Sequence, residues 1–242
     1  MYEVKRAVIP AAGLGNRMRP LTLEIPKPLV PVNGTPMIET VINALHENDI
    51  QEIYVVVGHL GEQFLYLEDK YPGLHILKNP YYESCNNISS LYVARQHLED
   101  SIILDGDQLV RNSSALSRGF ERSGYNCVWT DEMTDEWLLT AENGLVAKCS
   151  RTGGSHGWQL FSVSRWTAED GRKLRRHLEL EFDVNNNRQI YWDDIAMFCH
   201  SDEYELGIRP MDAGDVIEID SLPELAAIDS SYLKYIEKEG SL

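Results

Sequence analysis

The 242-residue sequence has few cysteines, few basic side chains and no long apolar run. Its four cysteines stand far apart, without Cys-x-x-Cys pairs or the dense spacing of small disulfide-bonded domains, so we expect reduced thiols. No stretch approaches the length that spans a bilayer, and no N-terminal apolar run leads to a small-residue cleavage site. These absences predict a cytoplasmic protein without membrane insertion.

Positive charge is scarce, because 22 Lys and Arg residues face 38 Asp and Glu residues, for a net charge of -16. Nucleic acids attract a positive protein field, so we expect no nucleic-acid partner. The exception is residues 1–27, with five basic and two acidic side chains. A basic segment in an acidic protein predicts a local anion site, with chance clustering as the alternative.

The first half of the sequence alternates between predicted strands and predicted helices. Short apolar runs indicate buried strands at residues 4–10, 53–57, 75–77 and 102–104. Helical spacing of apolar residues indicates helices at residues 37–45, 63–71 and 88–98. Thr35 and Pro36 are expected to cap and open the first of these. The alternation predicts an α/β, Rossmann-like fold with a mostly parallel mixed sheet flanked by helices.

The second half is expected to be a smaller, more antiparallel part. Asn143-Gly144 and Gly153-Gly154 turns separate short strands expected at residues 127–129, 137–140, 145–149 and 158–163. A helix should follow Thr167, which with Asp170 makes a capping signal, and a last helix should cover residues 222–237. The basic run at residues 172–176 is typical of a solvated helix face. We treat residues 1–242 as one domain, with a nucleotide-binding half at 1–125 and an acceptor-binding half at 126–242.

A glycine-rich loop follows the first predicted strand, and it fits neither of two common phosphate motifs. Met18 replaces the third glycine of the dinucleotide fingerprint, and the Gly-Lys-Ser/Thr of a P-loop is absent. Its glycines allow backbone N–H groups to approach a triphosphate, and Arg17 adds a forked donor. Lys27 lies between two prolines that stiffen the chain, suited to stabilising charge on an α-phosphate. For the loop alone, a glycine turn with solvated Arg17 and Lys27 is an equal alternative.

Two long segments around this loop resemble the signature of sugar-phosphate nucleotidyltransferases. They are Ala11-Ala12-Gly13-Leu14-Gly15-Asn16-Arg17-Met18-Arg19-Pro20-Leu21-Thr22 and Pro26-Lys27-Pro28-Leu29-Val30-Pro31-Val32. The resemblance implies that residues 11–16 bind the nucleotide and that Arg17 and Lys27 are catalytic.

Carboxylates stand at the ends of two predicted strands. Asp105 and Asp107 follow one apolar run, and Asp220 follows another. Mg²⁺ usually takes one or two protein carboxylates, and the resemblance assigns Asp107 and Asp220 to this metal. The alternatives are turn formation by Asp105 and Asp107 and helix capping by Asp220.

Aromatic and acidic residues occur together in the second half, at Trp137 and at residues 191–194. An aromatic cage beside carboxylates is how proteins hold a quaternary ammonium group. A lone tryptophan is more often a core residue.

Four segments together resemble bacterial phosphocholine cytidylyltransferases. They are Asn86-Asn87-Ile88-Ser89-Ser90-Leu91-Tyr92, Thr134-Asp135-Glu136-Trp137, Tyr191-Trp192-Asp193-Asp194 and Glu218-Ile219-Asp220-Ser221. The resemblance implies transfer of CMP from CTP to phosphocholine. Its implied nucleotide contacts are Asn86 and Asn87, and its implied acceptor contacts are Trp137, Tyr191, Trp192, Asp193 and Asp194.

Several alternatives stay open at this point. The residues do not separate CTP from UTP, and Asn86 and Asn87 are also common helix caps. The acceptor is open between phosphocholine, 2-aminoethylphosphonate and phosphoethanolamine. Different activities are a sugar-1-phosphate nucleotidyltransferase and a non-catalytic nucleotide-binding module. A homodimer is also left open.

Overall fold

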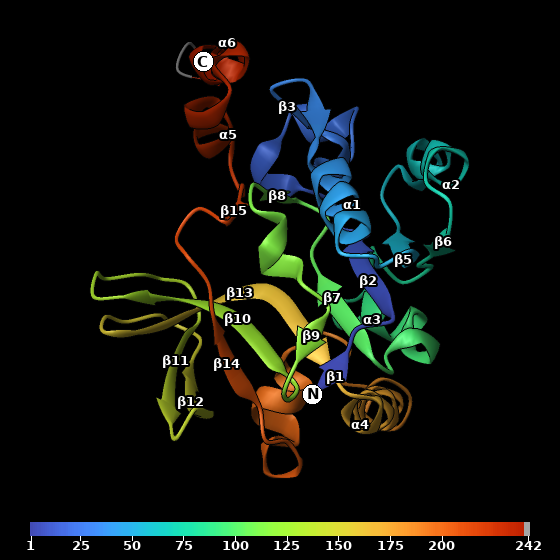
Figure 1. Ribbon diagram of the computed structural model, residues 1–242. Helices are drawn as coiled ribbons and strands as arrows, with labels where there is room; N and C mark the ends of the chain where they lie inside the picture. The colour runs from blue at the N-terminus through green and yellow to red at the C-terminus, as the bar shows by residue number, and fades with distance from the viewer. Residues whose placement is uncertain (240–242) are drawn as a thin grey trace.

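One nine-stranded sheet organises the computed structural model, which describes residues 1–239 (Figure 1). Its strand order is β10-β14-β12-β11-β13-β7-β2-β5-β6, and β10 also pairs with β13. The strands are β2 (Arg6–Ala11), β5 (Glu52–Val57), β6 (Leu74–Lys78), β7 (Ser101–Leu104), β10 (Gly124–Thr130), β11 (Leu138–Glu142), β12 (Leu145–Ser150), β13 (Gly157–Trp166) and β14 (Gly207–Pro210).

Helices and short strand pairs surround this sheet (Figure 1). The α-helices are α1 (Met37–Glu47), α2 (Tyr66–Lys70), α3 (Ile88–Val93), α4 (Ala168–Glu179), α5 (Leu222–Ile228) and α6 (Leu233–Glu239). The two-stranded pairs are β1 (Tyr2–Glu3) with β9 (Gly119–Phe120), β3 (Pro31–Val32) with β4 (Thr35–Pro36), and β8 (Gln108–Val110) with β15 (Val216–Glu218).

Strands β7, β2, β5 and β6 are parallel and form one end of the nine-stranded sheet, with β6 at its edge. Successive side chains of a strand point to opposite faces, and β2 follows this rule. Ala7 and Ile9 enter the cluster that includes apolar residues of α1, whereas Val8 enters the cluster that includes residues of α3 and α4. Each fully buried Val or Ile side chain stabilises the fold by about 1.5–3 kcal/mol. This burial on both faces fixes where β2 ends and its loop begins.

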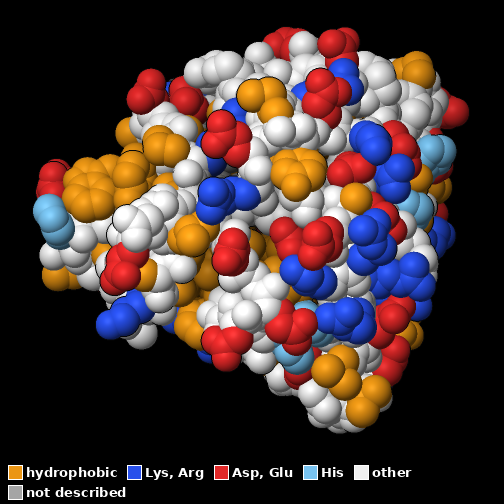
Figure 2. Space-filling model, turned by 60° about the horizontal axis from the view of Figure 1, so that its bottom comes forward, with side chains coloured by type: hydrophobic (Ala, Val, Ile, Leu, Met, Phe, Trp, Pro, Cys, Tyr) orange, Lys and Arg blue, Asp and Glu red, His pale blue; other side chains and the backbone are white. Residues whose placement is uncertain are grey.

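The predicted α/β fold with a mixed sheet and flanking helices is confirmed. The antiparallel strands extend the same sheet, because β13 pairs antiparallel with β10 along one edge and with β7 and β11 along the other. The ends of β10 and β13 protrude from the molecule (Figure 1). Hydrophobic side chains gather at this protruding end in Figure 2, and Trp129 and Met133 are exposed there.

The prediction that Thr35 caps the first helix was wrong. Thr35 pairs with Val32 in the β3–β4 hairpin, and α1 begins after Pro36 without a side-chain cap. The turn between the two strands is Asn33-Gly34, and both residues have positive φ angles. Asn-Gly is a typical two-residue hairpin turn, so this dipeptide was the overlooked signal.

Three predicted helices are shorter or interrupted. Residues 63–71 contain the end of a 3₁₀ turn followed by α2, and residues 88–98 contain α3 and a second 3₁₀ turn. The expected last helix is divided into α5 and α6 by Asp229, which has an extended backbone and accepts a hydrogen bond from the Ser231 amide. Asp and Ser side chains compete with helical hydrogen bonds in this way.

Other local predictions agree with the structure. Thr167 caps α4 by accepting a hydrogen bond from the Asp170 amide at 3.1 Å. The four cysteines, all within the described residues, are free thiols. No helix between residues 1 and 239 is long and apolar enough to cross a membrane.

Candidate active site

A cavity of about 620 Å³ lies beyond the carboxyl ends of β2 and β7. Such strand ends are where open α/β sheets bind ligands. Both halves of the chain line the cavity, from the loop after β2 to the segments that precede β11 and follow β15. Its lining includes seven carboxylate side chains and only three basic ones, Arg17, Lys27 and Arg151. The cavity is therefore strongly acidic.

The loop after β2 forms one wall of the cavity, through Ala11, Ala12, Gly13, Gly15 and Asn16. Gly15 has a φ of +63°, and a Cβ there would lie 2.8 Å from Thr22 Cγ2. The Thr22 hydroxyl donates a hydrogen bond to the Gly15 carbonyl at 2.8 Å, which holds the turn. A Cβ on Gly13 would meet no protein atom within 4 Å, so the loop leaves room for a ligand on its cavity side.

Lys27 bridges the two aspartates that the resemblance assigns to a metal. Its Nζ lies 2.5 Å from Asp107 Oδ2 and 2.7 Å from Asp220 Oδ1. The antiparallel pairing of Gln108 with Glu218 brings the two aspartates to the same end of β8 and β15. Burial alone lowers the pKa of Lys27, but the two carboxylates outweigh it and raise the pKa above its usual value. The ammonium group therefore stays charged.

Arg17 completes this basic group from the 3₁₀ turn Asn16–Met18. Its Nη2 lies 2.9 Å from Asp220 Oδ1. Burial raises the pKa of Asp220, but the positive charges of Lys27 and Arg17 together lower it by more than burial raises it. The pKa of Asp220 is therefore below its usual value. Asp220 is not the cap of α5, because Ser221 and Glu224 form a capping box there. The Asp220 side chain faces the cavity instead.

Asp107 and Asp220 form a donor set that fits a divalent cation such as Mg²⁺. Their carboxylate oxygens converge on one point, which the Lys27 ammonium marks. Mg²⁺ binds through one or two carboxylates and completes its coordination with water and phosphate. A triphosphate entering so acidic a cavity also requires accompanying cations, because like charges repel.

Asp193 lies in the part of the cavity formed by the second half of the chain. It is 8% exposed, and its Oδ1 has no hydrogen-bond partner among the described residues. Burial raises the pKa of Asp193 to about 7, and the nearby Tyr125 hydroxyl counters part of this effect, although it makes no hydrogen bond of good geometry with any described residue. Asp194 and Glu218 add repulsion that raises it further. Asp193 is thus a buried carboxylate that lacks a cation.

Two predicted aromatic residues, Trp137 and Tyr191, line the cavity with their ring centroids 5.8 Å apart. The Arg151 guanidinium lies beside them, with Cζ 5.6 Å from the Trp137 ring centroid and 4.0 Å from that of Phe198. Arg151 also pairs with Asp194 at 2.5 Å. The aromatic rings of Trp137 and Phe198 are therefore already in contact with a cation, the Arg151 guanidinium.

The structure does not bring every predicted residue to the cavity wall. Trp192 is 2% exposed and packs between Tyr125 and Trp166 in the core, so its ring does not line the cavity. Asp194 is buried against Arg151 and the Tyr191 amide. Leu14 is also outside the cavity lining.

The two predicted asparagines, Asn86 and Asn87, both form hydrogen bonds within the protein. Asn87 lines the cavity, and its Oδ1 accepts a hydrogen bond from the Trp192 amide at 2.9 Å. Asn86 is outside the lining and donates to the Gln189 carbonyl at 3.1 Å. Both residues therefore hold the loop that carries Tyr191 and Asp193.

Five charged cavity residues were not among the predicted site residues, and Asp105, Glu218 and Arg151 are three of them. Burial raises the pKa of Asp105 well above its usual range, and the Asp107 and Asp193 carboxylates add to this. Burial likewise raises the pKa of Glu218 to about 7. Glu218 had a signal in the sequence, a carboxylate inside an apolar run. Nothing in the sequence indicated that Arg151 lines the cavity, because this residue lies in a turn whose position depends on the β11–β12 hairpin.

The glycine loop, the buried lysine and the convergent aspartates at the strand ends together define a nucleotidyltransferase site. The chain belongs to the family of the MobA-like NTP transferase domain, whose model matches residues 7–165. The part of the cavity that contains Asp193 and Asp220 lies beyond the matched residues.

Relatives are similar over nearly the whole chain. The 2-aminoethylphosphonate cytidylyltransferase of Lancefieldella rimae is 39% identical over 234 residues, 96% of this chain and 94% of that one. The choline-phosphate cytidylyltransferase of Streptococcus pneumoniae is 31% identical over 224 residues, 93% of this chain and 96% of that one. A solved structure of CTP:phosphocholine cytidylyltransferase from Streptococcus pneumoniae has a TM-score of 0.86 at 31% identity, over 95% of this chain and 99% of that one.

Proposed function

We propose that this protein transfers CMP from CTP to 2-aminoethylphosphonate. The observation that carries the choice of acceptor is Asp193, a buried cavity carboxylate whose Oδ1 has no hydrogen-bond partner among the described residues. A primary ammonium group supplies both a positive charge and N–H donors to such an oxygen. A quaternary ammonium supplies the charge alone.

The relatives support both parts of this proposal. The one named 2-aminoethylphosphonate cytidylyltransferase is 39% identical, compared with 31% for the choline-phosphate enzyme. Both names specify cytidylyl transfer, which supports CTP as the nucleotide.

In the proposed reaction, a phosphonate oxygen attacks the α-phosphorus of CTP in line. A P–O bond forms to the acceptor as the bond to the β-phosphate oxygen breaks, and pyrophosphate leaves with that electron pair. No covalent bond to the enzyme forms. Positioning and charge stabilisation supply most of the rate enhancement in such reactions.

Each cavity group has a defined part in this chemistry. The loop amides and Arg17 hold the triphosphate, and Lys27 stabilises negative charge that develops on the α-phosphoryl group. Asp107 and Asp220 would hold Mg²⁺, which neutralises phosphate charge when bound. Asp193 orients the ammonium end of the acceptor.

Phosphocholine is the second candidate acceptor. The edge-to-face pair of Trp137 and Tyr191 favours it, because aromatic rings attract quaternary ammonium groups. The structural match to the phosphocholine enzyme also favours it.

The test measures pyrophosphate release with CTP or UTP against four acceptors, with Mg²⁺ or a chelator. The acceptors are 2-aminoethylphosphonate, phosphoethanolamine, phosphocholine and glucose-1-phosphate. We expect the highest kcat/KM with CTP and 2-aminoethylphosphonate. Fastest turnover with phosphocholine would transfer the assignment to the second candidate, and fastest turnover with glucose-1-phosphate would reject both.

A further inference from the structure

Arg151 belongs to a turn that is fixed beside the acceptor end of the cavity. Two backbone hydrogen bonds of 2.9 Å join Thr134 to Gly154, and the Ser150 hydroxyl donates to the Gly153 carbonyl at 2.7 Å. Gly153 has a φ of +69°, and a Cβ there would lie 1.8 Å from the Thr134 carbonyl oxygen. The turn therefore packs tightly against the segment that leads to Trp137, and its backbone position is well defined.

The Arg151 guanidinium occupies an aromatic surface that is suited to a cation. Its Cζ lies 4.0 Å from the ring centroid of Phe198 and 5.6 Å from that of Trp137. The two rings are themselves edge to face, with centroids 5.7 Å apart. Cation–π attraction of this kind stabilises a guanidinium and a quaternary ammonium alike.

The charge of Arg151 is matched by Asp194, which is 1% exposed. Arg151 Nη2 lies 2.5 Å from Asp194 Oδ1, while Asp194 Oδ2 accepts a hydrogen bond from the Tyr191 amide at 3.0 Å. A ligand that displaced Arg151 would leave this buried carboxylate without its cation, which is strongly unfavourable.

On the basis of the function proposed above, we propose that Arg151 determines acceptor specificity by occupying the aromatic surface that a trimethylammonium group would use. A primary ammonium binds at Asp193 and leaves the Arg151–Asp194 pair intact. A trimethylammonium group gains little at Asp193 and must compete with the guanidinium for Trp137 and Phe198. Arg151 thus selects against N-methylated acceptors.

The test compares wild type with Arg151→Met and with the double variant Arg151→Met, Asp194→Asn. The double variant removes both charges, so it folds without an unpaired buried carboxylate even if the single variant does not. We expect the ratio of kcat/KM for phosphocholine to that for 2-aminoethylphosphonate to rise about tenfold, which is the size of a cation–π contact in a partly desolvated site. A ratio within twofold of wild type in the folded variants would overturn the proposal.

Tetramethylammonium binding, measured by calorimetry and by tryptophan fluorescence, tests the same idea without turnover. We expect about tenfold tighter binding in the variants than in wild type and no gain for methylammonium. Equal tetramethylammonium affinity in wild type and variants would overturn the proposal. If wild type uses no amine acceptor, the proposed function fails, and this titration still decides the role of Arg151.

Arg172→Met is the matched control, because Arg172 pairs with Glu99 at 2.7 Å on the face of α4. We expect wild-type substrate ratios and tetramethylammonium affinity from this variant. A shift equal to that of Arg151→Met would mean that loss of any surface arginine has this effect, and would also overturn the proposal.

Discussion

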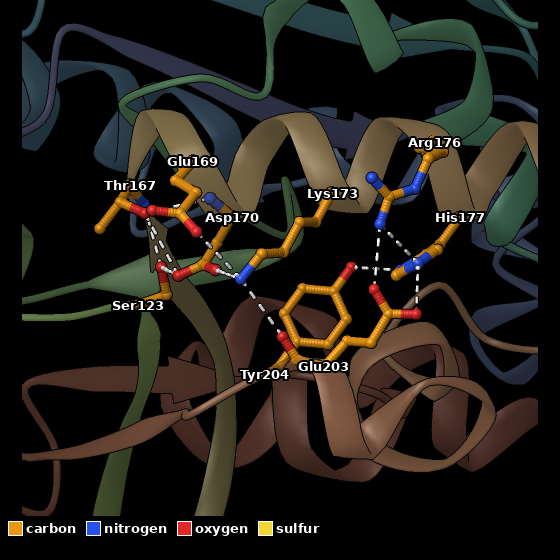
Figure 3. A network of polar contacts seen from close by, with 9 residues as sticks. All are labelled: Ser123, Thr167, Glu169, Asp170, Lys173, Arg176, His177, Glu203 and Tyr204. Carbon is orange, nitrogen blue, oxygen red and sulfur yellow. Dashed lines mark hydrogen bonds and ion pairs between the residues drawn. The ribbon is translucent and has the colours of Figure 1, made fainter.

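Charged side chains are dense in two regions of the molecule, the face of α4 and the cavity, and they are arranged differently. On α4, Lys173 pairs with Asp170 at 3.1 Å and Arg176 pairs with Glu203 at 3.0 Å (Figure 3). Basic and acidic side chains stand side by side over the surface in Figure 2. In the cavity, seven carboxylates share three basic side chains, and Asp193 has no cation beside it.

The difference separates charge that is neutralised by partners within the protein from charge that is left in excess around the cavity. The basic run at residues 172–176 has its partners within the protein. Arg172 and Arg176 pair with Glu99 and Glu203 of neighbouring segments, and Lys173 and Arg175 pair with carboxylates of α4 itself. The cavity keeps an excess of carboxylates at a cost in stability, as proteins do at functional sites. We propose that the ammonium group of the acceptor and a divalent cation neutralise this excess.

The largest effect is expected from Lys27→Ala, which removes the cation between the two cavity aspartates. Turnover should fall at least about 100-fold, because Lys27 stabilises charge at the reacting phosphoryl group. CTP affinity, measured by calorimetry, should fall much less. Lys5→Ala is the control, because Lys5 pairs with Asp100 at 2.6 Å outside the cavity. Equal losses in turnover and affinity would mean that Lys27 only binds the nucleotide.

Asp107→Asn should have the next largest effect. Removing one of the two carboxylates that we propose hold Mg²⁺ should lower turnover by about 100-fold. It should also weaken Mg²⁺ binding, which calorimetry measures directly in the presence of a non-hydrolysable CTP analogue. Asp100→Asn, outside the cavity, should behave as wild type. Full wild-type activity in a chelator would remove the metal from the mechanism.

Asp193→Asn should act on the acceptor and not on the nucleotide. The amide keeps the size of the side chain and loses its charge, so KM for 2-aminoethylphosphonate should rise about tenfold, as for loss of a charge-assisted hydrogen bond. KM for CTP should change less than about twofold. A larger effect on CTP than on the acceptor would place Asp193 in the nucleotide site.

The pH dependence of stability tests the raised pKa of Asp193, which burial moves to about 7. In the unfolded chain this carboxyl ionises near pH ~4. Ionisation therefore favours the unfolded state as the pH rises from about 4 to 7, and the folded protein loses stability over that window. The quantity to compare is the Tm of Asp193→Asn minus the Tm of wild type. This difference should be about 5 °C larger at pH 8 than at pH 5. A constant difference in Tm would show that the pKa is not raised.

The smallest effect is expected on α4, where the Arg172–Glu99 ion pair is exposed. Arg172→Ala should change the free energy of unfolding by less than about 0.5 kcal/mol, because solvent screens such pairs. Urea denaturation measures this, and turnover should stay unchanged. A loss of activity in Arg172→Ala would contradict the view that the charges of α4, unlike those of the cavity, take no part in turnover.

Contiguous sequence motifs predicted much of this site. The glycine loop and Lys27 lie within one short stretch, and Asp107 and Asp220 follow apolar runs that are strands. In residues 191–194 the composition was informative, but the direction of each side chain was not. Tyr191 and Asp193 line the cavity, while the alternate residues Trp192 and Asp194 face the protein. The composition of residues 191–194 does not determine which two side chains face the cavity and which two face the protein core.

The pairing of β8 with β15 joins Lys27 to Asp220, which are 193 residues apart in the chain. Contacts of such long sequence separation form late, because a long loop must close first. On the ribosome, the β2 loop can fold long before its partner strand has been synthesised. The cavity therefore stays incomplete until residue 220 has emerged, and a protease cut before β15 that releases the residues after it would remove Asp220 from Lys27 while leaving the parallel strands in place.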